Sequence, residues 1–258
     1  MNSSVNRLRY AGTFALVLAV GATVAGCGGA GDEGGDSLTV LAASSLSGSF
    51  ADLEQLFHED HPGVDVRLSF DSSATLAGQV VEGAPADVLA TADEQTMESA
   101  VAAGATDGRP TAFASNHLVL VVPDDNPAAI HSVSDLDGEG VDYVVCVPSA
   151  PCGNIAAAAL HEAGIDAPAA SEEADVKAVL SKVMLGEADA GLVYTTDALA
   201  AGSSVRAFEV SSSPATTTRY FIAPLRDAAD AGLAQDWVDL VMSRRGQKVL
   251  SDAGFGSP

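Results

Sequence analysis

The sequence has 258 residues, 47% of them hydrophobic, and carries 12 Lys and Arg against 35 Asp and Glu. Its net charge of −23 at pH 7 offers no basic surface to displace counterions from phosphates, so nucleic acid is excluded as an expected partner. The acidic residues are expected to form a solvated surface, and the length suffices for two lobes of about 100 residues with a cleft between them.

The N-terminal segment has the pattern of a lipoprotein signal. Arg7 and Arg9 precede an apolar run from Ala11 to Ala25, which is shorter than the roughly 18 to 20 residues that a membrane-spanning helix needs. Val24-Ala25-Gly26-Cys27 resembles a bacterial lipobox, so we expect residues 1–26 to be removed and Cys27 to carry a lipid. The mature chain then has 10 basic and 35 acidic residues, a net charge of −25.

Two strand, serine pair and helix units open the globular part. Residues 28–37, GGAGDEGGDS, are rich in glycine and are expected to form a flexible tether. A short apolar strand at 38–43 is followed by Ser44-Ser45 and then by apolar residues at helical spacing up to Pro62-Gly63. An alternating strand at 64–70 is followed by Ser72-Ser73 and a helix at 75–82.

Strands and helices continue to alternate along the rest of the chain. Further strands are predicted at 85–91, 116–122, 141–147 and 190–194, and further helices at 94–103, about 154–163, 176–185 and, as one or two helices, 231–250. This alternation predicts an α/β protein with mainly parallel sheets.

Four predicted helix starts carry groups that suit an anion. Ligands of open parallel sheets sit beyond the carboxyl ends of the strands, where helix N-termini present unpaired N–H groups and a partial positive charge. These starts are marked by Ser44-Ser45, Ser72-Ser73, Cys152-Gly153 and Asp175-Val176. Either serine pair alone is more simply interpreted as an ordinary helix cap. The combination of all four favours one small anion site made of hydroxyl and amide donors.

The residues of these segments also resemble those of a known family. The matching segments are VLAASSLSGSF at 40–50, SFDSSATLAGQV with EGAPADV and TADE within 69–94, Pro151-Cys152-Gly153, Ala174-Asp175-Val176-Lys177, GEADAGLVYTTDA at 186–198 and the C-terminal RRGQKVLSDAGFG. In this order they resemble the periplasmic molybdate-binding proteins of ABC transporters, over about residues 38–256. Cys152 departs from the family, which often has Ala there, and Lys177 replaces a common Arg.

The resemblance implies a two-lobed, type II periplasmic-binding fold that closes around the ligand. It implies that lobe I comprises residues 38–115 with 197–258, and lobe II residues 116–196. The ligand residues that it implies are Ser45, Ser73, Cys152, Val176 and Tyr194, with the neighbouring Ser44 and Ser72 ranked lower.

The function implied by the resemblance is extracytoplasmic capture of molybdate, and of tungstate, for delivery to an ABC importer. Expected partners are the oxyanion, the permease with its ATPase, and the membrane through the lipid on Cys27. The protein is expected to be a monomer at the outer face of the cytoplasmic membrane or in the periplasm, without a cofactor and without protein side chains bound directly to a metal. Sulfate or another tetrahedral oxyanion is the alternative ligand, and Asp71 is the one candidate acceptor for a phosphate that keeps a proton.

Cys146 and Cys152 are the two cysteines that remain beside Cys27. An exported chain meets an oxidising compartment, so a disulfide that stiffens the ligand loop is the preferred interpretation, and two free buried thiols are the alternative.

A serine-dependent hydrolase is a less favoured alternative, and the protein is not expected to be an enzyme. The serine pairs lie in no Gly-x-Ser-x-Gly elbow and begin no Ser-x-x-Lys motif. His58 and His61 flank two acidic residues, but no further His or Cys cluster supports a metal site. Asp87 and Asp93 are expected to be turn and capping residues, because a carboxylate would repel a dianion.

Overall fold

The computed structural model describes residues 36–210 and 216–258. The predicted signal peptide, the lipid-bearing Cys27 and most of the predicted tether lie outside the described residues. Within the described ranges, no helix has the length and apolar character needed to cross a membrane.

The described chain alternates strands with helices. The strands are β1 (Ser37–Ala43), β2 (Asp65–Asp71), β3 (Val88–Thr91), β4 (Thr111–Pro123), β5 (Tyr143–Cys146), β6 (Ser171–Glu173), β7 (Ala190–Tyr194), β8 (Val205–Glu209) and β9 (Thr217–Pro224). The α-helices are α1 (Ser47–Asp60), α2 (Ser73–Val81), α3 (Glu94–Ala102), α4 (Pro151–Ala163), α5 (Val176–Met184), α6 (Thr195–Ala201), α7 (Ala231–Met242) and α8 (Arg244–Asp252). Short 3₁₀ helices are η1 (Ser44–Leu46), η2 (Val133–Asp137) and η3 (Gly202–Ser204).

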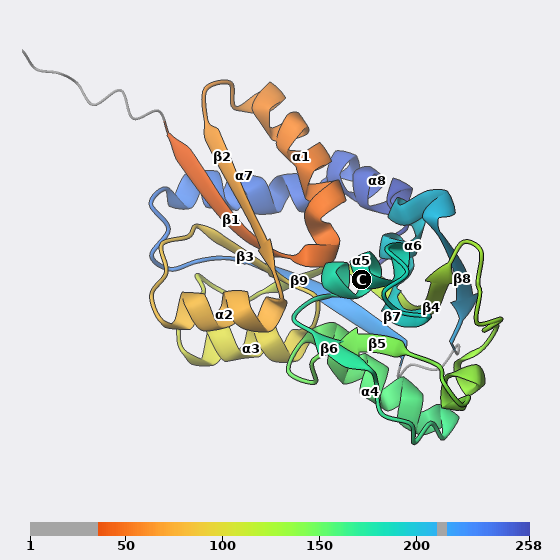
Figure 1. Cartoon of the computed structure of the whole chain (residues 1–258). Coiled ribbons are helices and arrows are strands. Elements are labelled where there is room, and N and C mark those ends of the chain that lie inside the picture. The colour runs from red at the N-terminus through yellow and green to blue at the C-terminus, as the bar shows by residue number, and fades with distance from the viewer. Residues whose placement is uncertain (1–35, 211–215) are drawn as a thin grey trace, which may run out of the picture. The chain divides into compact units, whose positions relative to one another are not determined.

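The strands form one mixed sheet, in the order β2-β1-β3-β9-β4-β7-β5-β6, with β8 pairing beside β4 (Figure 1). The ladders β1–β2, β1–β3, β5–β6 and β5–β7 are parallel. The ladders β3–β9, β4–β7, β4–β8 and β4–β9 are antiparallel. The α/β class is thus confirmed, with parallel strands toward both ends of the sheet and antiparallel pairing in its centre.

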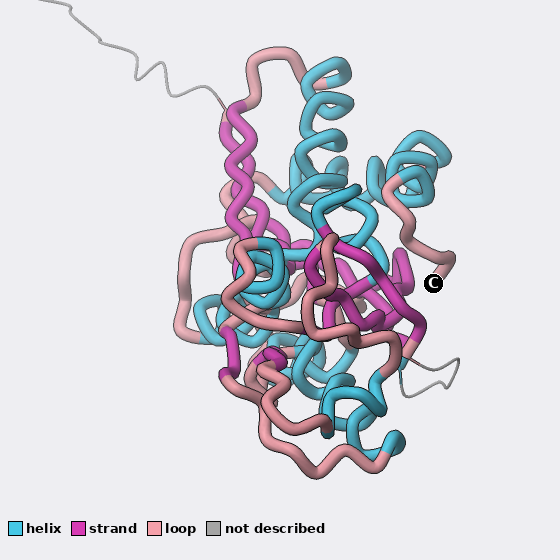
Figure 2. The backbone as a smooth tube through the Cα atoms, turned by 45° about the vertical axis from the view of Figure 1, so that its right-hand side comes forward, coloured by secondary structure: helices cyan, strands magenta, loops and turns pink. Residues whose placement is uncertain are grey.

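Strand β4 takes part in both halves of this sheet. Residues 111–117 pair with β9, whereas residues 118–123 pair with β7 and β8. Toward one end of the sheet β1 and β2 run side by side in register (Figure 2). The two parallel groups of strands therefore share one continuous strand.

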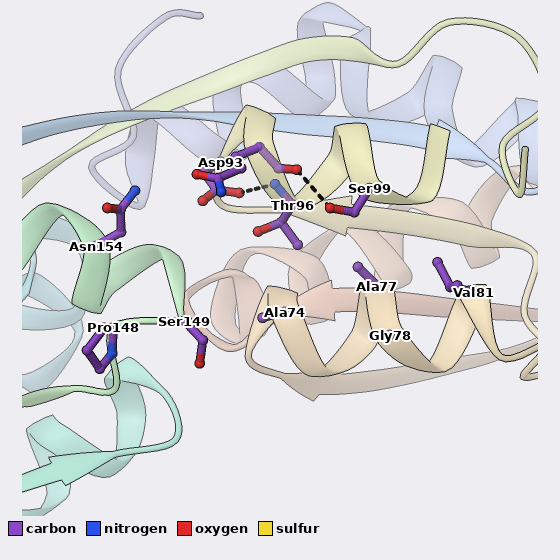
Figure 3. A pocket seen from close by; sticks show the side chains of 11 residues that line it. Ala74, Ala77, Gly78, Val81, Asp93, Thr96, Ser99, Pro148, Ser149 and Asn154 are labelled. Carbon is purple, nitrogen blue, oxygen red and sulfur yellow. Dashed lines mark hydrogen bonds between the residues drawn. The ribbon is translucent and has the colours of Figure 1, made fainter. Parts of the chain in front are cut away.

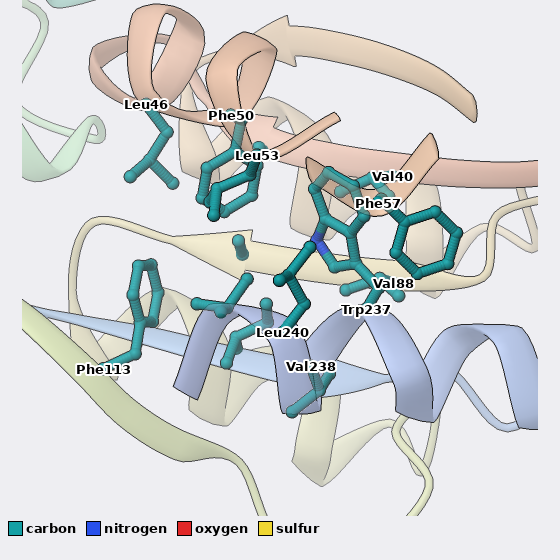
Figure 4. Close-up of a cluster of buried hydrophobic side chains, with 14 of the residues drawn as sticks. Val40, Leu46, Phe50, Leu53, Phe57, Val88, Phe113, Trp237, Val238 and Leu240 are labelled. Atoms are coloured by element: carbon teal, nitrogen blue, oxygen red, sulfur yellow. The ribbon is translucent and has the colours of Figure 1, made fainter. Parts of the chain in front are cut away.

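The core around β1 to β3 depends on the apolar stripe of α1. Phe50 and Phe57 of this helix enclose the buried Trp237 of α7, with ring centroids 5.7 and 5.4 Å from the indole (Figure 4). Each such side chain contributes about 1.5–3 kcal/mol on burial, so this packing fixes α1 on the sheet. It also fixes the serine turn of η1, which leads directly into α1.

Apolar cores lie on both faces of each strand group. Strands β1, β3 and β9 contribute to one core beside α1, α7 and α8 and to another beside α2 and α3. Strands β5 and β7, with the second half of β4, contribute to cores beside α5 and beside α4. Ala198 and Val205 belong to the core beside α5.

Two helices begin earlier than predicted, and both differences bear on the site. Helix α2 begins at Ser73 rather than Thr75, so Ser72 occupies the cap position. Helix α4 begins at Pro151 rather than Asn154, because a proline at the first helical position loses no intrahelical hydrogen bond. Cys152 therefore lies in the first turn of a helix.

Candidate functional site

A small cavity lies where several strands end and their helices begin. About 210 Å³ within its bounds is not filled by atoms, and this volume includes open solvent at its mouth. Its lining residues come from β1 and η1, from β2 and α2, from the end of β3, and from α4, α5 and β7: Ala43, Ser44, Ser45, Asp71, Ser72, Ser73, Ala92, Pro151, Cys152, Asp175, Val176 and Tyr194. All seven residues named above as expected or lower-ranked ligands lie on this one cavity. Their binding of a ligand remains a prediction.

Two of the serine hydroxyls are held by buried neighbours. Ser45 Oγ is 2.8 Å from the hydroxyl of Tyr220, and Ser73 Oγ accepts the backbone N–H of Ala92 at 2.9 Å. Because the Ser73 oxygen accepts from Ala92, its own proton is free to be donated to a ligand. A neutral O–H donor suits a fully ionised oxyanion.

Two other hydroxyls on the cavity have no partner among the described residues. Ser72 Oγ and the Tyr194 hydroxyl are both buried and make no hydrogen bond. Ser72 occupies the cap position of α2, yet its side chain does not cap the helix. An unpaired buried hydroxyl costs about 1–3 kcal/mol, so two of them on one small cavity point to a ligand that accepts hydrogen bonds. Burial also raises the pKa of Tyr194 well above its ordinary value, which keeps this hydroxyl a proton donor.

The starts of α4 and α5 bring backbone N–H groups to the same cavity. The Asp175 side chain caps α5 by accepting the N–H groups of Lys177 and Ala178, which leaves that of Val176 uncapped by this carboxylate. Cys152 is the second residue of α4, so its N–H also lies in the first turn of a helix. The unpaired N–H groups of two helix N-termini and their partial positive charge favour an anion.

The turn before α4 is covalently and sterically constrained. Cys146 and Cys152 form a disulfide with Cα atoms 5.8 Å apart. A Cβ added at Gly153 would meet the Val147 carbonyl oxygen at 2.0 Å, so only glycine permits this approach of the helix to the end of β5. The N–H of Cys152 is therefore held close to a fixed position.

No cationic side chain lines the cavity among the described residues. Lys177 instead pairs with the fully buried Asp197 at 2.8 Å. Burial raises the pKa of Asp197, and the Lys177 charge opposes this shift. Asp71 does line the cavity, with one carboxylate oxygen accepting the Ser72 N–H at 2.6 Å. An anion here would be held by neutral donors and helix ends, near two acidic residues, Asp71 and Asp175, whose charges oppose binding.

A larger groove next to the cavity is a weaker candidate for a small anion. It lies between α2, α3 and the loop before α4 (Figure 3), and about 800 Å³ within its bounds, open solvent included, is not filled by atoms. Thr96 and Ser99 line it from α3, and Ala74 lines it one residue after Ser73. The buried unpaired hydroxyls lie on the small cavity instead.

The residues that were not expected to bind a ligand have structural partners. Asp93 caps α3 by accepting the Thr96 N–H, as predicted. Asp87 is buried and accepts the N–H groups of Thr39 and Ala229, so it joins β1 to the segment before α7. His58 and His61 lie near Glu54 and Asp236. Within residues 36–210 and 216–258, no cluster of His, Cys, Asp or Glu could hold a metal ion.

Comparison with known proteins covers nearly the whole described chain. Residues 38–256 match the family described as bacterial extracellular solute-binding protein. The molybdate-binding protein ModA of Mycobacterium tuberculosis is 39% identical over 226 residues, which cover 88% of this chain and 87% of that protein.

Two solved structures share the fold. The periplasmic molybdate-binding protein of Azotobacter vinelandii superposes with a TM-score of 0.76 at 21% identity, covering 86% of this chain and 99% of that one. The sulfate-binding protein SubI of Mycobacterium tuberculosis superposes with a TM-score of 0.74 at 20% identity, covering 85% and 86%. At these identities the two structures support the fold alone.

Proposed function

Because this chain belongs to the family of bacterial extracellular solute-binding proteins, we propose that it binds molybdate, and also tungstate, for an ABC importer. The ligand is suggested by the ModA relative at 39% identity, whose name gives molybdate as what it binds. The relatives are binding proteins, and the proposed function requires no catalytic step and no cofactor.

The observation that carries this proposal is the set of donors on the small cavity. Ser45, Ser73 and the helix starts at Cys152 and Val176 meet there with the Tyr194 hydroxyl. Every one of these groups is a neutral hydrogen-bond donor, and the Tyr194 hydroxyl has no protein partner among the described residues. Such a set suits a dianion that accepts hydrogen bonds at all of its oxygens.

The two-lobed arrangement is part of the proposal. We propose that lobe I comprises residues 38–115 with 216–258 and lobe II residues 116–210, with β4 as the first crossover, whereas the resemblance implies that the second part of lobe I starts at residue 197. The separate apolar cores of the two strand groups support this division. Ala198 and Val205 pack in the second group, which favours placing α6 and β8 in lobe II.

The cellular setting follows from the family and from the N-terminal motif. We propose that the mature chain is a monomer tethered by a lipid on Cys27 outside the cytoplasmic membrane. From there it would deliver the oxyanion to the permease, which its ATPase drives. Labelling with a radioactive fatty acid tests the anchor, because Cys27→Ala should abolish incorporation of the label.

Titration calorimetry of the purified protein tests the ligand. We expect tight binding of molybdate and tungstate, weak binding of sulfate and little binding of phosphate. Molybdate and sulfate share charge and shape, so the size of the cavity must separate them. A preference for sulfate or phosphate would contradict the proposal. Hydrolysis of an ester or peptide that Ser45→Ala abolishes would favour the serine hydrolase instead.

A further inference from the structure

A chain of buried hydrogen bonds connects the centre of the sheet to Ser45. Asn116 lies on β4 and Tyr220 on β9, two strands that pair directly (Figure 1). The Asn116 amide nitrogen is 3.4 Å from the Tyr220 hydroxyl, and that hydroxyl is 2.8 Å from Ser45 Oγ. Asn116 and Tyr220 are 1% and 0% exposed, so water does not compete for these bonds.

The orientation of the Asn116 side chain is fixed by its neighbours. Its oxygen accepts the backbone N–H of His117 at 2.9 Å, and that N–H can only donate. The amide nitrogen must therefore face the other way, where it donates to Thr196 Oγ1 at 2.9 Å and to Tyr220. An inverted amide would place two donors against each other.

The donor and acceptor of each remaining hydrogen bond follow from the protons that Tyr220 and Ser45 carry. Burial raises the pKa of Tyr220, so this side chain keeps its single hydroxyl proton. The Tyr220 hydroxyl contacts the Asn116 amide nitrogen, which can only donate, and Ser45 Oγ, which can accept, so we infer that the Tyr220 proton is donated to Ser45. The Ser45 oxygen then accepts from Tyr220, and its own proton is left for another acceptor. Ser45 lines the cavity, where an oxyanion would be that acceptor.

We propose that Asn116 and Tyr220 are positioning residues that make Ser45 a committed hydrogen-bond donor to the bound oxyanion. The inference rests on the proposed function, because Ser45 is one of its expected ligand residues. Neither residue lines the cavity, so both act through Ser45. Orientation before the ligand arrives lowers the free-energy cost of ordering the site on binding.

The structure provides a second serine for comparison. Ser73 is oriented by the Ala92 backbone N–H and has no bond to Tyr220. The Tyr220 ring is held by edge-on contacts with Phe113, Tyr194 and Phe255, at centroid distances of 6.0, 6.1 and 5.3 Å. Tyr220→Phe should therefore remove the hydroxyl and leave the packing of the ring unchanged.

A double-mutant cycle in the molybdate Kd tests the proposal. Tyr220→Phe, Ser45→Ala and the double variant are titrated with molybdate, and the Tm of each ligand-free protein is measured. We expect Tyr220→Phe to weaken binding by about tenfold in the wild-type background and by less than about twofold in the Ser45→Ala background. In the Ser73→Ala background its full effect should persist. A purely structural role would move Tm but would not give this selective coupling.

A second variant reverses the hydrogen bonds. In N116D the carboxylate oxygens can only accept, so Tyr220 would donate to them and accept the Ser45 proton instead. We expect a loss of affinity larger than that of Tyr220→Phe; the part that acts through Ser45 should disappear in the Ser45→Ala background, whereas repulsion of the anion by the new carboxylate should persist there. Equal effects of Tyr220→Phe with and without Ser45, or no effect in the wild type, would overturn the positioning role. Failure of the wild-type protein to bind any oxyanion would instead overturn the proposed function itself.

Discussion

Replacing Tyr194 by Phe should change stability and affinity in opposite directions. The Tyr194 side chain is 1% exposed, and its hydroxyl has no partner among the described residues. A buried unpaired polar group costs about 1–3 kcal/mol, so its removal should stabilise the ligand-free protein. A gain of about 1 kcal/mol raises Tm by roughly 2–4 °C in a chain of this size.

The same substitution removes a hydrogen bond to the charged ligand. Such bonds contribute about 1.5–3 kcal/mol, and each 1.4 kcal/mol is about tenfold in Kd. Molybdate should therefore bind about 10-fold to 150-fold more weakly to Tyr194→Phe. Calorimetry gives the Kd, and scanning calorimetry without ligand gives Tm.

Tyr143→Phe is the matched control for this prediction. Its hydroxyl donates to the Ala167 carbonyl at 2.5 Å, away from the cavity. This variant should lower Tm because a made hydrogen bond is lost, and it should leave the Kd unchanged. A Tyr194→Phe protein with lower Tm and wild-type Kd would refute the argument that the unpaired hydroxyl serves the ligand.

Three further predictions concern other groups at the site. Replacing both Cys146 and Cys152 by Ser opens a loop that the disulfide closes over a separation of six residues. The free energy of unfolding, measured in urea, should fall by about 2 kcal/mol, and molybdate should bind more weakly. Unchanged values would contradict the role of the disulfide. Asp71→Asn keeps a group that accepts the Ser72 N–H but removes a charge, so calorimetry should show molybdate binding about threefold to tenfold tighter; weaker binding would contradict the repulsion. Burial raises the pKa of Asp197 above its ordinary value of 3.8. Above pH 3.8 the folded chain therefore binds more protons than the unfolded chain. The free energy of unfolding then falls as the pH rises toward the raised pKa. Urea unfolding of wild type and Asp197→Asn between pH 4 and pH 6 should therefore show a stability difference that moves in favour of the variant as pH rises, and a constant difference would contradict the shift.

Local patterns sufficed to predict most elements of the two strand groups. Strand β7 occupies the predicted residues 190–194, because a short apolar run bounded by turns has few alternatives. Helix α5 begins at Val176 as predicted, since an aspartate before an apolar periodic segment is a strong capping signal. The serine pairs were also predicted to lie at helix starts, and the structure places them at η1 and α2.

The centre of the sheet could not be predicted in the same way. No local pattern predicts an element between Tyr194 and Ala231, where the structure has α6, β8 and β9. Strand β9 pairs with β3 and β4, which are distant in sequence, so its place depends on tertiary contacts rather than on a local period.

The predicted site residues came together, but their hydrogen-bonding states were not visible in the sequence. The Ser72 hydroxyl has no hydrogen-bond partner among the described residues, although Ser72 occupies the cap position of α2. The Ser73 hydroxyl, in the first turn of α2, accepts the backbone N–H of Ala92. The roles of Asn116 and Tyr220 depend on the register of β4 against β9, for which the sequence has no signal. The sequence therefore predicts which segments meet, whereas the direction of each hydrogen bond follows only from the folded structure.

The shared strand β4 has a consequence for how the protein loses its structure. Its backbone forms hydrogen bonds to β9 over one half and to β7 and β8 over the other, and the described residues belong to a single compact unit. Melting either strand group exposes one half of β4 and removes support from the other half. Chemical denaturation should therefore be one cooperative transition, in which Trp237 fluorescence, reporting on one group, coincides with circular dichroism, reporting on both.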